Sequence, residues 1–222
     1  MDVIDAMKTR KSIRGFKKDP VPKGLIHKIL EAAVRAPSGL NTQPWEFVVA
    51  TGEKLDKIRE EITSLFSQGA FPTYEFLRKP FEGVYRKRQV ELGIELYRLM
   101  GIAREDKEKR NQWTMHGLRF FEAPCQIVIC TDKELQYPLD MIGIGAVCQS
   151  ICLAALEYGL GTCIADQGIW YEQVWRKYAD IPDSKRLVEG ITMGYPDWDH
   201  QANKLVTARE QVDNITAWLG FE

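Results

Sequence analysis

The sequence lacks any apolar stretch long enough to span a bilayer, and it lacks the beginning of a secretory signal. Its N-terminus, MDVIDAMKTR, has acids where such a signal has a basic start and an apolar run. It also lacks net charge, because 30 Lys and Arg nearly balance 31 Asp and Glu to give -1. This balance argues against wholesale binding to nucleic acid or to an anionic membrane. We therefore expect a cytoplasmic protein with neither kind of partner.

Several metal and nucleotide motifs are missing as well. The five cysteines form no CxxC pair and lie in apolar runs, which argues against a disulfide framework or zinc site and indicates buried small side chains. There is no Walker sequence and no HExxH. The GxG of Gly143 and Gly145 falls inside a predicted helix rather than after a strand, so no dinucleotide fingerprint is present.

What remains is the pattern of a globular α/β chain. A length of 222 residues can bury one good core, so we expect one domain over residues 1–222. Four segments have the apolar composition of buried strands: 46–51, 125–131, a stretch from Thr162, and 187–196. Five have helical spacing or helix-ending Pro and Gly residues: 2–9, 25–34, 53–66, 140–158 and the region around Val174.

Two segments differ in character from that core. Residues 67–118 interleave helical patches with Pro72, Pro80, Gly83 and Gly101, and indicate a helical excursion. Residues 74–119 hold eleven Lys or Arg against seven Asp or Glu, a local +4 that either steers anionic substrates or belongs to solvated helix faces. The apolar C-terminal stretch, residues 215–221, should dock on a surface such as that of a partner subunit.

The first concentration of chemistry is a basic turn near the N-terminus. Six basic residues fall within eleven positions with no acid before Asp19: Lys8, Arg10, Lys11, Arg14, Lys17 and Lys18. Arg10 and Arg14 flank Ser12, so two guanidinium forks and a hydroxyl could converge on one phosphate. The alternative is a solvated basic turn.

A second polar cluster, APSGLNTQPW at 36–45, lies between a predicted helix and a predicted strand. Its hydroxyl, amides and indole are suited to reading the polar edge of a flat ring. Ser38 and Asn41 could instead cap a local turn.

Together, RKSIRGF at 10–16 and APSGLNTQPWEFVV at 36–49 resemble the FMN-dependent nitroreductase family. The resemblance continues in order through 120–130, 140–162 and 190–210, and is weakest over 67–118. Each motif is degenerate alone, but five in the right order are specific. The resemblance implies an α+β, three-layer fold with a mixed, mostly antiparallel sheet between helices. It also implies a domain-entwined homodimer with one FMN in each of two interface sites.

The resemblance further implies which residues hold the flavin chain. Four residues of the basic turn would bind the phosphate and ribityl edge, namely Arg10, Lys11, Ser12 and Arg14. Arg209 would complete the phosphate clamp. Three residues of the second cluster would come from the partner subunit, namely Ser38, Asn41 and Gln43.

Around the flavin ring, Gln167 and Gly168 align with the backbone near N5, and the preceding Asp166 is assigned to the same cofactor site. Arg119 occupies the place of a cation near the pyrimidine side, and is the candidate for stabilising negative charge at N1 and O2 of the reduced flavin. His116 stands where many relatives have Asn, so its role as a cofactor ligand competes with that of a packed or hydrogen-bonded histidine.

The implied activity is a ping-pong hydride transfer from NAD(P)H through FMN to a nitroaromatic, quinone or related aromatic acceptor, without a protein nucleophile. Tyr85 and Trp113 in the excursion, which in this family covers the active site, would contact the substrate. One alternative is a reductive dehalogenase or other reductase of the same superfamily. The deiodinases, however, carry PSGAHTEPW where this chain has PSGLNTQPW, and their lid spacing is not matched at Glu82 and Tyr85. The other alternative is a non-catalytic FMN-binding or flavin-handling protein.

Overall fold

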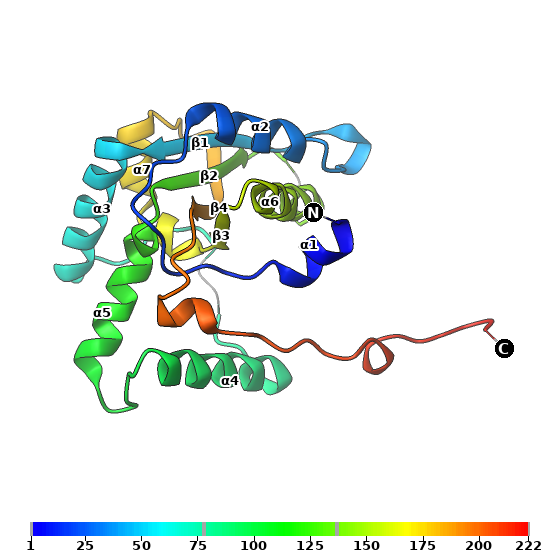
Figure 1. Cartoon of the computed structure of the whole chain (residues 1–222). Helices are drawn as coiled ribbons and strands as arrows, with labels where there is room; N and C mark the ends of the chain where they lie inside the picture. Colours follow the sequence, from blue (N-terminus) through cyan, green and yellow to red (C-terminus); the bar gives the residue numbers. More distant parts are fainter. Residues whose placement is uncertain (1, 77–78, 136–137, 222) are drawn as a thin grey trace.

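The chain folds around an antiparallel sheet, described here from a computed structural model that covers residues 2–76, 79–135 and 138–221 (Figure 1). Within these residues the strands are β1 (Glu46–Thr51), β2 (Cys125–Asp132), β3 (Gly161–Ile164) and β4 (Lys185–Gly194). Their order is β1-β2-β4-β3, and every neighbouring pair is antiparallel. The parallel component is an isolated bridge between Ser12 and Thr162.

Helices cover the sheet on both faces, which confirms the expected three layers. They are α1 (Val3–Thr9), α2 (Lys23–Ala33), α3 (Gly52–Ser67), α4 (Gly83–Leu99), α5 (Lys107–Leu118), α6 (Met141–Glu157) and α7 (Glu172–Ala179). The Asp2 side chain caps α1 by accepting hydrogen bonds from the N–H groups of Ile4 and Asp5. Gly159, at a φ of +69°, ends α6 in the left-handed conformation that favours glycine.

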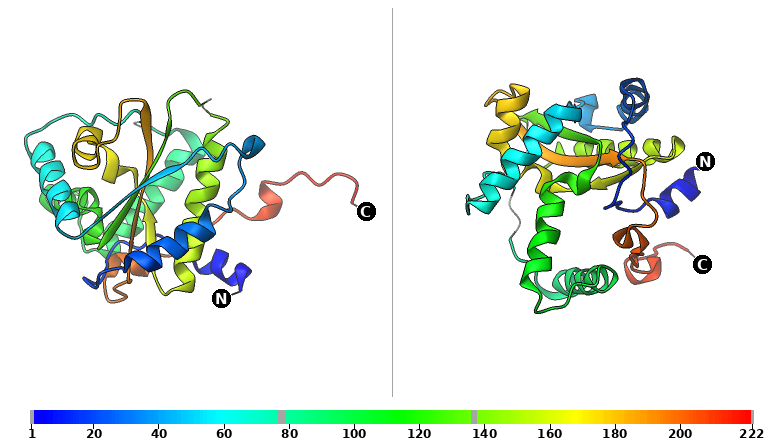
Figure 2. Two further views of the ribbon diagram at one scale, coloured as in Figure 1. Left: turned by 90° about the horizontal axis from the view of Figure 1, so that it is seen from above. Right: turned by 60° about the vertical axis from the view of Figure 1, so that its left-hand side comes forward.

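The core consists of two apolar layers, one on each side of the sheet. On one face Ile127 and Ile129 of β2 pack with α2 and α6, and on the other Val128 and Cys130 pack with α3 and α7. The alternation along β2 follows from the two-residue period of a strand. Figure 2 shows the sheet between these helices from two further directions.

All five cysteines are buried, which confirms the prediction made for them. Burial raises the pKa of the Cys125 and Cys148 thiols to about 12. The pKa values of the Cys130 and Cys152 thiols are raised to about 11, with burial as the largest cause.

Residues 46–51 form a strand, as predicted, but the prediction that this strand is buried is wrong. Of the six residues in β1 only Ala50 is buried, and Val49 is 40% exposed. The physical reason is that β1 lies at the end of the sheet, with a strand on one side only, so parts of it stay open to solvent.

The excursion contains α4 and α5, and α4 is attached to the body mainly at its C-terminal end. There Leu96 packs with Ala202 and Leu205, while most other side chains of α4 are exposed. Beyond α4 the C-terminal tail stands away from the body (Figures 1 and 2). Its apolar side chains are exposed in the single chain, including Ile215 at 69% and Leu219 at 83%, so the tail does not dock on its own subunit.

The long helix α6 carries apolar as well as polar side chains on its outer side, and Ile142 there is 74% exposed. Among the described residues, no helix combines the length and the apolar character needed to cross a membrane.

Candidate active site

The basic turn forms one wall of a groove of about 600 Å³. Arg10, Lys11, Ser12 and Arg14 line it together with the extended segment from Leu205 to Glu210. The third wall is one face of α4, with the i, i+3, i+4, i+7 spacing of a helix: Arg88, Glu91, Leu92 and Glu95. The structure therefore brings together Arg10, Lys11, Ser12, Arg14 and Arg209, which the family resemblance had grouped.

One buried amide holds the two chain ends together in this groove. Asn203 is 1% exposed, and its Oδ1 accepts a hydrogen bond of 2.7 Å from the Arg14 N–H. Its Nδ2 donates to the carbonyl oxygens of Gly15 (2.8 Å) and Asp197 (2.7 Å). Because these groups are 6 to 189 residues apart in sequence, Asn203 fixes the basic turn against the C-terminal segment.

The charges of the groove favour an anion. Five cations and three acids line it. Arg88 is paired with Glu210 at 2.9 Å across the groove, and the hydrogen bonds of Arg209 within the described residues go to Thr207 and Ala208 nearby. Among the described residues no ion pair engages the guanidinium groups of Arg10 or Arg14. Guanidinium groups without carboxylate partners beside a hydroxyl are the donor set that a phosphate monoester requires.

Lys11 is held at the same place by a different group. Its Nζ donates to the carbonyl oxygen of Asn203 and lies 5.5 Å from the centroid of the Trp198 ring. Both contacts tie the basic turn to the segment that carries Asn203.

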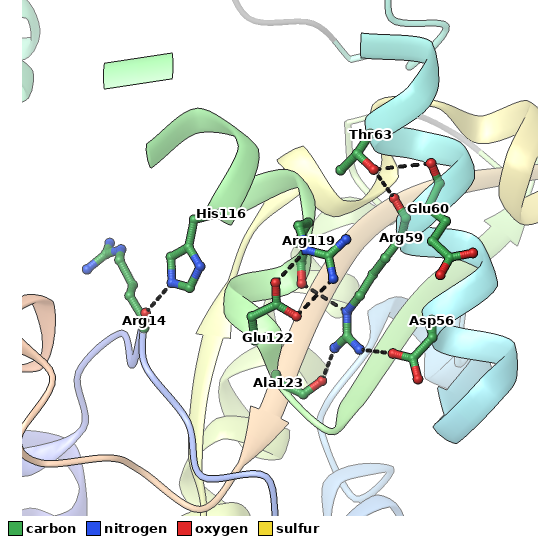
Figure 3. Close-up of polar contacts among 9 residues, drawn as sticks. All are labelled: Arg14, Asp56, Arg59, Glu60, Thr63, His116, Arg119, Glu122 and Ala123. Carbon is green, nitrogen blue, oxygen red and sulfur yellow. Dashed lines mark hydrogen bonds and ion pairs between the residues drawn. The ribbon is translucent and has the colours of Figure 1, made fainter. Parts of the chain in front are cut away.

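His116 supports the groove from behind, through its Nε2, which lies 3.0 Å from the Arg14 carbonyl oxygen (Figure 3). Burial lowers the pKa of His116, and burial together with the neighbouring His116 lowers that of His200. The two imidazole rings stack with centroids 5.7 Å apart and planes at 16°. A neutral His116 can donate through Nε2 to the Arg14 carbonyl, so it acts here on the main chain of the groove.

The segment expected near the flavin ring follows β3 as a short 3-10 turn, Asp166–Ile169. It is fixed on two sides. A Cβ atom at Gly117 would lie 2.3 Å from Oε1 of Gln167, so α5 packs directly against that side chain. On the other side the Gly168 carbonyl oxygen accepts a 2.6 Å hydrogen bond from the Trp175 indole.

Arg119 lies apart from the groove. It forms a two-pronged ion pair with Glu122, and this pair raises the pKa of Arg119 (Figure 3). The pair flanks a left-handed turn in which Phe120, Phe121 and Glu122 have φ values of 57°, 53° and 56°. Positive φ values at three consecutive residues other than glycine are energetically costly.

Arg59 clamps that turn. Its guanidinium is buried, donates to the carbonyl oxygens of Arg119 (3.0 Å) and Ala123, and pairs with Asp56 at 2.6 Å (Figure 3). The two carbonyls lie immediately before and after Phe120–Glu122. Arg59 therefore holds the strained turn from both ends.

The loop with Ser38, Asn41 and Gln43 does not line the groove of the same chain. It lies beside α6, where a Cβ atom at Gly143 would be 3.1 Å from the Ser38 Cβ. Ser38 Oγ accepts a 2.9 Å hydrogen bond from the Gln43 N–H, so Ser38 also caps the local turn. Leu40, Asn41 and Gln43 have positive φ values, and the Leu40 side chain is fully exposed.

The two predicted substrate residues have different surroundings. Tyr85 on α4 is 64% exposed and lines neither the groove nor the second pocket. Trp113 on α5 lines that second pocket, of about 320 Å³, together with His116 and His200.

Three residues with clear roles in this geometry had no role in the sequence analysis: Asn203, His200 and Arg88. Asn203 and His200 lie within the family motif at 190–210, but nothing in their spacing indicates contact with Arg14 or His116. Arg88 is one of several cations of the excursion, and only its place on the α4 face that lines the groove distinguishes it.

Comparison with known proteins agrees with this geometry. The profile of the Nitroreductase family matches residues 7–195. The chain is 31% identical over 222 residues to a nitrobenzene nitroreductase of Ectopseudomonas oleovorans, and 30% identical to a chloronitrobenzene nitroreductase of Comamonas testosteroni. Both matches cover 98% of this chain and 96% of the relative.

Among solved structures, the fold is similar to that of an FMN and NADPH-dependent nitroreductase, NfnB, from Sphigopyxis sp. strain HMH. The TM-score is 0.94 at 29% identity, with 100% of each chain covered. The family profile spans most of the chain and the two relatives nearly all of it. The chain belongs to the nitroreductase family.

Proposed function

We propose that this protein is an FMN-dependent NAD(P)H oxidoreductase that reduces nitroaromatic, quinone or related aromatic acceptors. The observation that carries the proposal is the groove in which Arg10, Ser12, Arg14 and Arg209 meet without an acid paired to Arg10 or Arg14 among the described residues. These groups fit the terminal phosphate of FMN in charge and in hydrogen-bonding capacity. The similarity to nitroreductases described as dependent on FMN and NADPH supports the same cofactors here.

When bound, FMN would accept a hydride from NAD(P)H and deliver two electrons to the acceptor in a separate step. For a nitro group the balance is one NAD(P)H and one proton in, and one nitroso product, one water and NAD(P)⁺ out. No side chain of this protein forms a covalent bond in that scheme.

The chain's own residues would bind FMN and orient its ring. Arg10, Arg14 and Arg209 would hold the phosphate, and neutral His116 would keep the Arg14 main chain in place through the bond to its carbonyl oxygen. The Asp166–Gly168 turn, fixed between α5 and the Trp175 indole, would present rigid backbone to the ring. Arg119 would act on the reduced flavin only where its pair with Glu122 opens.

We also infer that the working form is a homodimer of single-domain chains. Ser38, Asn41 and Gln43 do not line the groove of their own chain, so one chain alone supplies only part of the expected cofactor set. Ile142 on the outer side of α6 and the apolar side chains within residues 215–221 are exposed in one chain, and a covering surface would bury them. A second copy would provide it.

The test is a spectrum of the purified protein followed by anaerobic titration with NADPH and with NADH. The expected result is one FMN per chain, bleached by a nicotinamide and reoxidised by nitrobenzene. A protein that takes up no FMN at micromolar concentration would overturn the proposal. Bound FMN that neither nicotinamide bleaches would instead identify a flavin-handling protein.

A further inference from the structure

Gln126 places a primary amide inside the apolar layer that β2 shares with α3 and α7. The next residues on that face of the strand are Val128 and Cys130, and Gln126 itself is 0% exposed. Within the described residues, neither its Nε2 nor its Oε1 has a hydrogen-bond partner. A buried amide without partners destabilises a fold, whereas an apolar side chain of the same shape would not. Packing alone therefore does not explain a glutamine at this position.

Two glycines make room for this amide. A Cβ atom at Gly168 would lie 3.1 Å from Gln126 Nε2, and a Cβ atom at Gly190 in β4 would lie 2.6 Å from the same nitrogen. Both glycines are buried. A glycine inside a strand often marks a place where another group approaches the backbone closely. Here that group is the Gln126 amide, which faces both glycines.

The first of these glycines belongs to the turn that is expected to face the flavin ring, Asp166–Ile169. The turn is partly exposed at Asp166 and Gln167, whereas Gly168 is buried and lies against Gln126. The amide therefore stands behind the turn, on the side away from solvent.

The opening at Gly190 also reaches the residue that precedes the turn. A Cβ atom there would lie 2.9 Å from the Ala165 carbonyl oxygen, so this acceptor and the Gln126 donor border the same small space. The Ala165 oxygen already accepts a 3.2 Å hydrogen bond from the Gly168 N–H. A carbonyl oxygen has a second lone pair for another donor. Rotation about the side-chain torsions of Gln126 would bring Nε2 to it.

We propose that Gln126 is a positioning residue for the turn that faces the flavin. Its Nε2 donates to the Ala165 carbonyl oxygen, and its bulk prevents Gly168 from moving back into the core. The backbone next to the flavin N5 is thereby held at one depth. That this turn faces the ring rests on the proposed function, whereas the link between Gln126 and the turn rests on the contacts of the two glycines.

Hydrogen exchange of the purified full chain tests the link, whether or not FMN is bound. Gln126→Met replaces the amide by an apolar side chain of similar shape. Loss of one hydrogen bond should speed exchange in residues 165–169 about two- to tenfold and leave exchange in α2 unchanged. The matched control Gln68→Met makes the same change at an exposed position after α3, and should alter neither. If exchange of the turn in Gln126→Met is as slow as in the unsubstituted protein or slower, the amide has no partner there and the proposal is wrong.

Flavin reduction provides the second readout. In Gln126→Met the rate constant for bleaching of bound FMN by saturating NADPH should fall about two- to tenfold. The Kd for FMN, which depends on the groove, should stay the same. An unchanged rate constant would overturn the positioning role.

Gln126→Glu should rescue this rate in a way that depends on pH. Burial favours the protonated carboxyl, whose O–H can donate to the same oxygen until the group ionises. The rate constant should match that of the unsubstituted protein at about pH 6 and fall below it at about pH 9. A ratio of the two rate constants that does not depend on pH would contradict the hydrogen bond. If the chain binds no FMN, the proposed function and the flavin-facing role fail together, and the exchange experiment still decides the link between Gln126 and the turn.

Discussion

The groove and the second pocket adjoin at Arg14, yet they are built in opposite ways. The groove joins residues 10–14 to residues 205–210 and depends on Asn203 to hold those distant segments together. The pocket takes four of its lining residues from one face of α5 and is closed by the adjacent loop and His200. The groove is lined by five cations and three acids, whereas the pocket is lined by the rings of Trp113, His116 and His200 and by one ammonium, that of Lys109.

This difference indicates which substitutions should disrupt each cavity. A site assembled from both ends of the chain fails when a single long-range tether is cut. A site built on one helix survives that loss as long as the end of the helix is held. In this molecule the end of α5 is held by the turn that Arg59 clamps.

The largest expected effect is therefore that of Arg59→Met, which removes both hydrogen bonds to the strained turn. The buried Ala123 carbonyl and the partly buried Arg119 carbonyl lose charged donors, so we expect a loss of about 4 kcal/mol in the free energy of unfolding. Denaturant unfolding measures it. The control is Arg98→Met, which breaks only an exposed pair with Glu95 and should leave stability unchanged. Similar midpoints for both variants would show that the turn needs no clamp.

Next comes Asn203→Ala, which should cut the tether of the groove. Three backbone groups lose their partner, and we expect about 3 kcal/mol less stability together with loss of FMN retention. The exposed Asn214, whose side chain donates a hydrogen bond to Glu210, provides the control Asn214→Ala. If FMN affinity stays the same in Asn203→Ala, the groove does not depend on the tether.

A smaller effect, confined to the groove, is expected for Arg209→Ala. Loss of one charge-assisted phosphate contact, worth about 1.5 to 3 kcal/mol, should weaken FMN binding roughly ten- to a hundredfold. Arg110→Ala is the comparison, because Arg110 lies over the Tyr97 ring and outside both cavities. Fluorescence titration of the apoprotein with FMN measures both. Equal affinities would remove Arg209 from the phosphate site.

The smallest expected effect is on the pH dependence of stability, through the two histidines of the pocket wall. Since burial lowers the folded-state pKa values of His116 and His200, the unfolded chain takes up protons first as pH falls. Their contribution to stability is fully present above about pH 6.5 and is lost as pH falls through the folded-state values.

Thermal melts between pH 8 and pH 5 test this directly. His116→Asn keeps a donor for the Arg14 carbonyl but does not titrate, so its melting temperature should depend less on pH. His27→Asn, at an exposed position, should keep the original pH dependence. If His116→Asn leaves the slope of melting temperature against pH unchanged, the stacked histidine pair does not contribute to the pH dependence of stability.

Local features of this molecule could be predicted from the sequence, and long-range ones could not. The strand at 46–51 and the helix at 140–158 have the expected bounds within one residue, because spacing and Gly159 act locally. The grouping of Arg10, Lys11, Ser12, Arg14 and Arg209 in the groove follows from motifs shared with the family, and the α4 wall with Arg88 does not. Asn203 and His200 escaped attention because their contacts with Arg14, Gly15 and His116 join residues 84 to 189 positions apart in sequence. The exposure of β1 depends on which strand neighbours it, which no local pattern encodes.

The burial of every cysteine has a practical consequence for experiments on the free C-terminal tail. Maleimides react with thiolates, and thiols as buried as Cys125, with a pKa of about 12, stay protonated and shielded at neutral pH. A cysteine introduced at the exposed position Ala217 would therefore be the one that takes up a spin label. The distance between two such labels would then trace the path of the tail across a second copy of the chain.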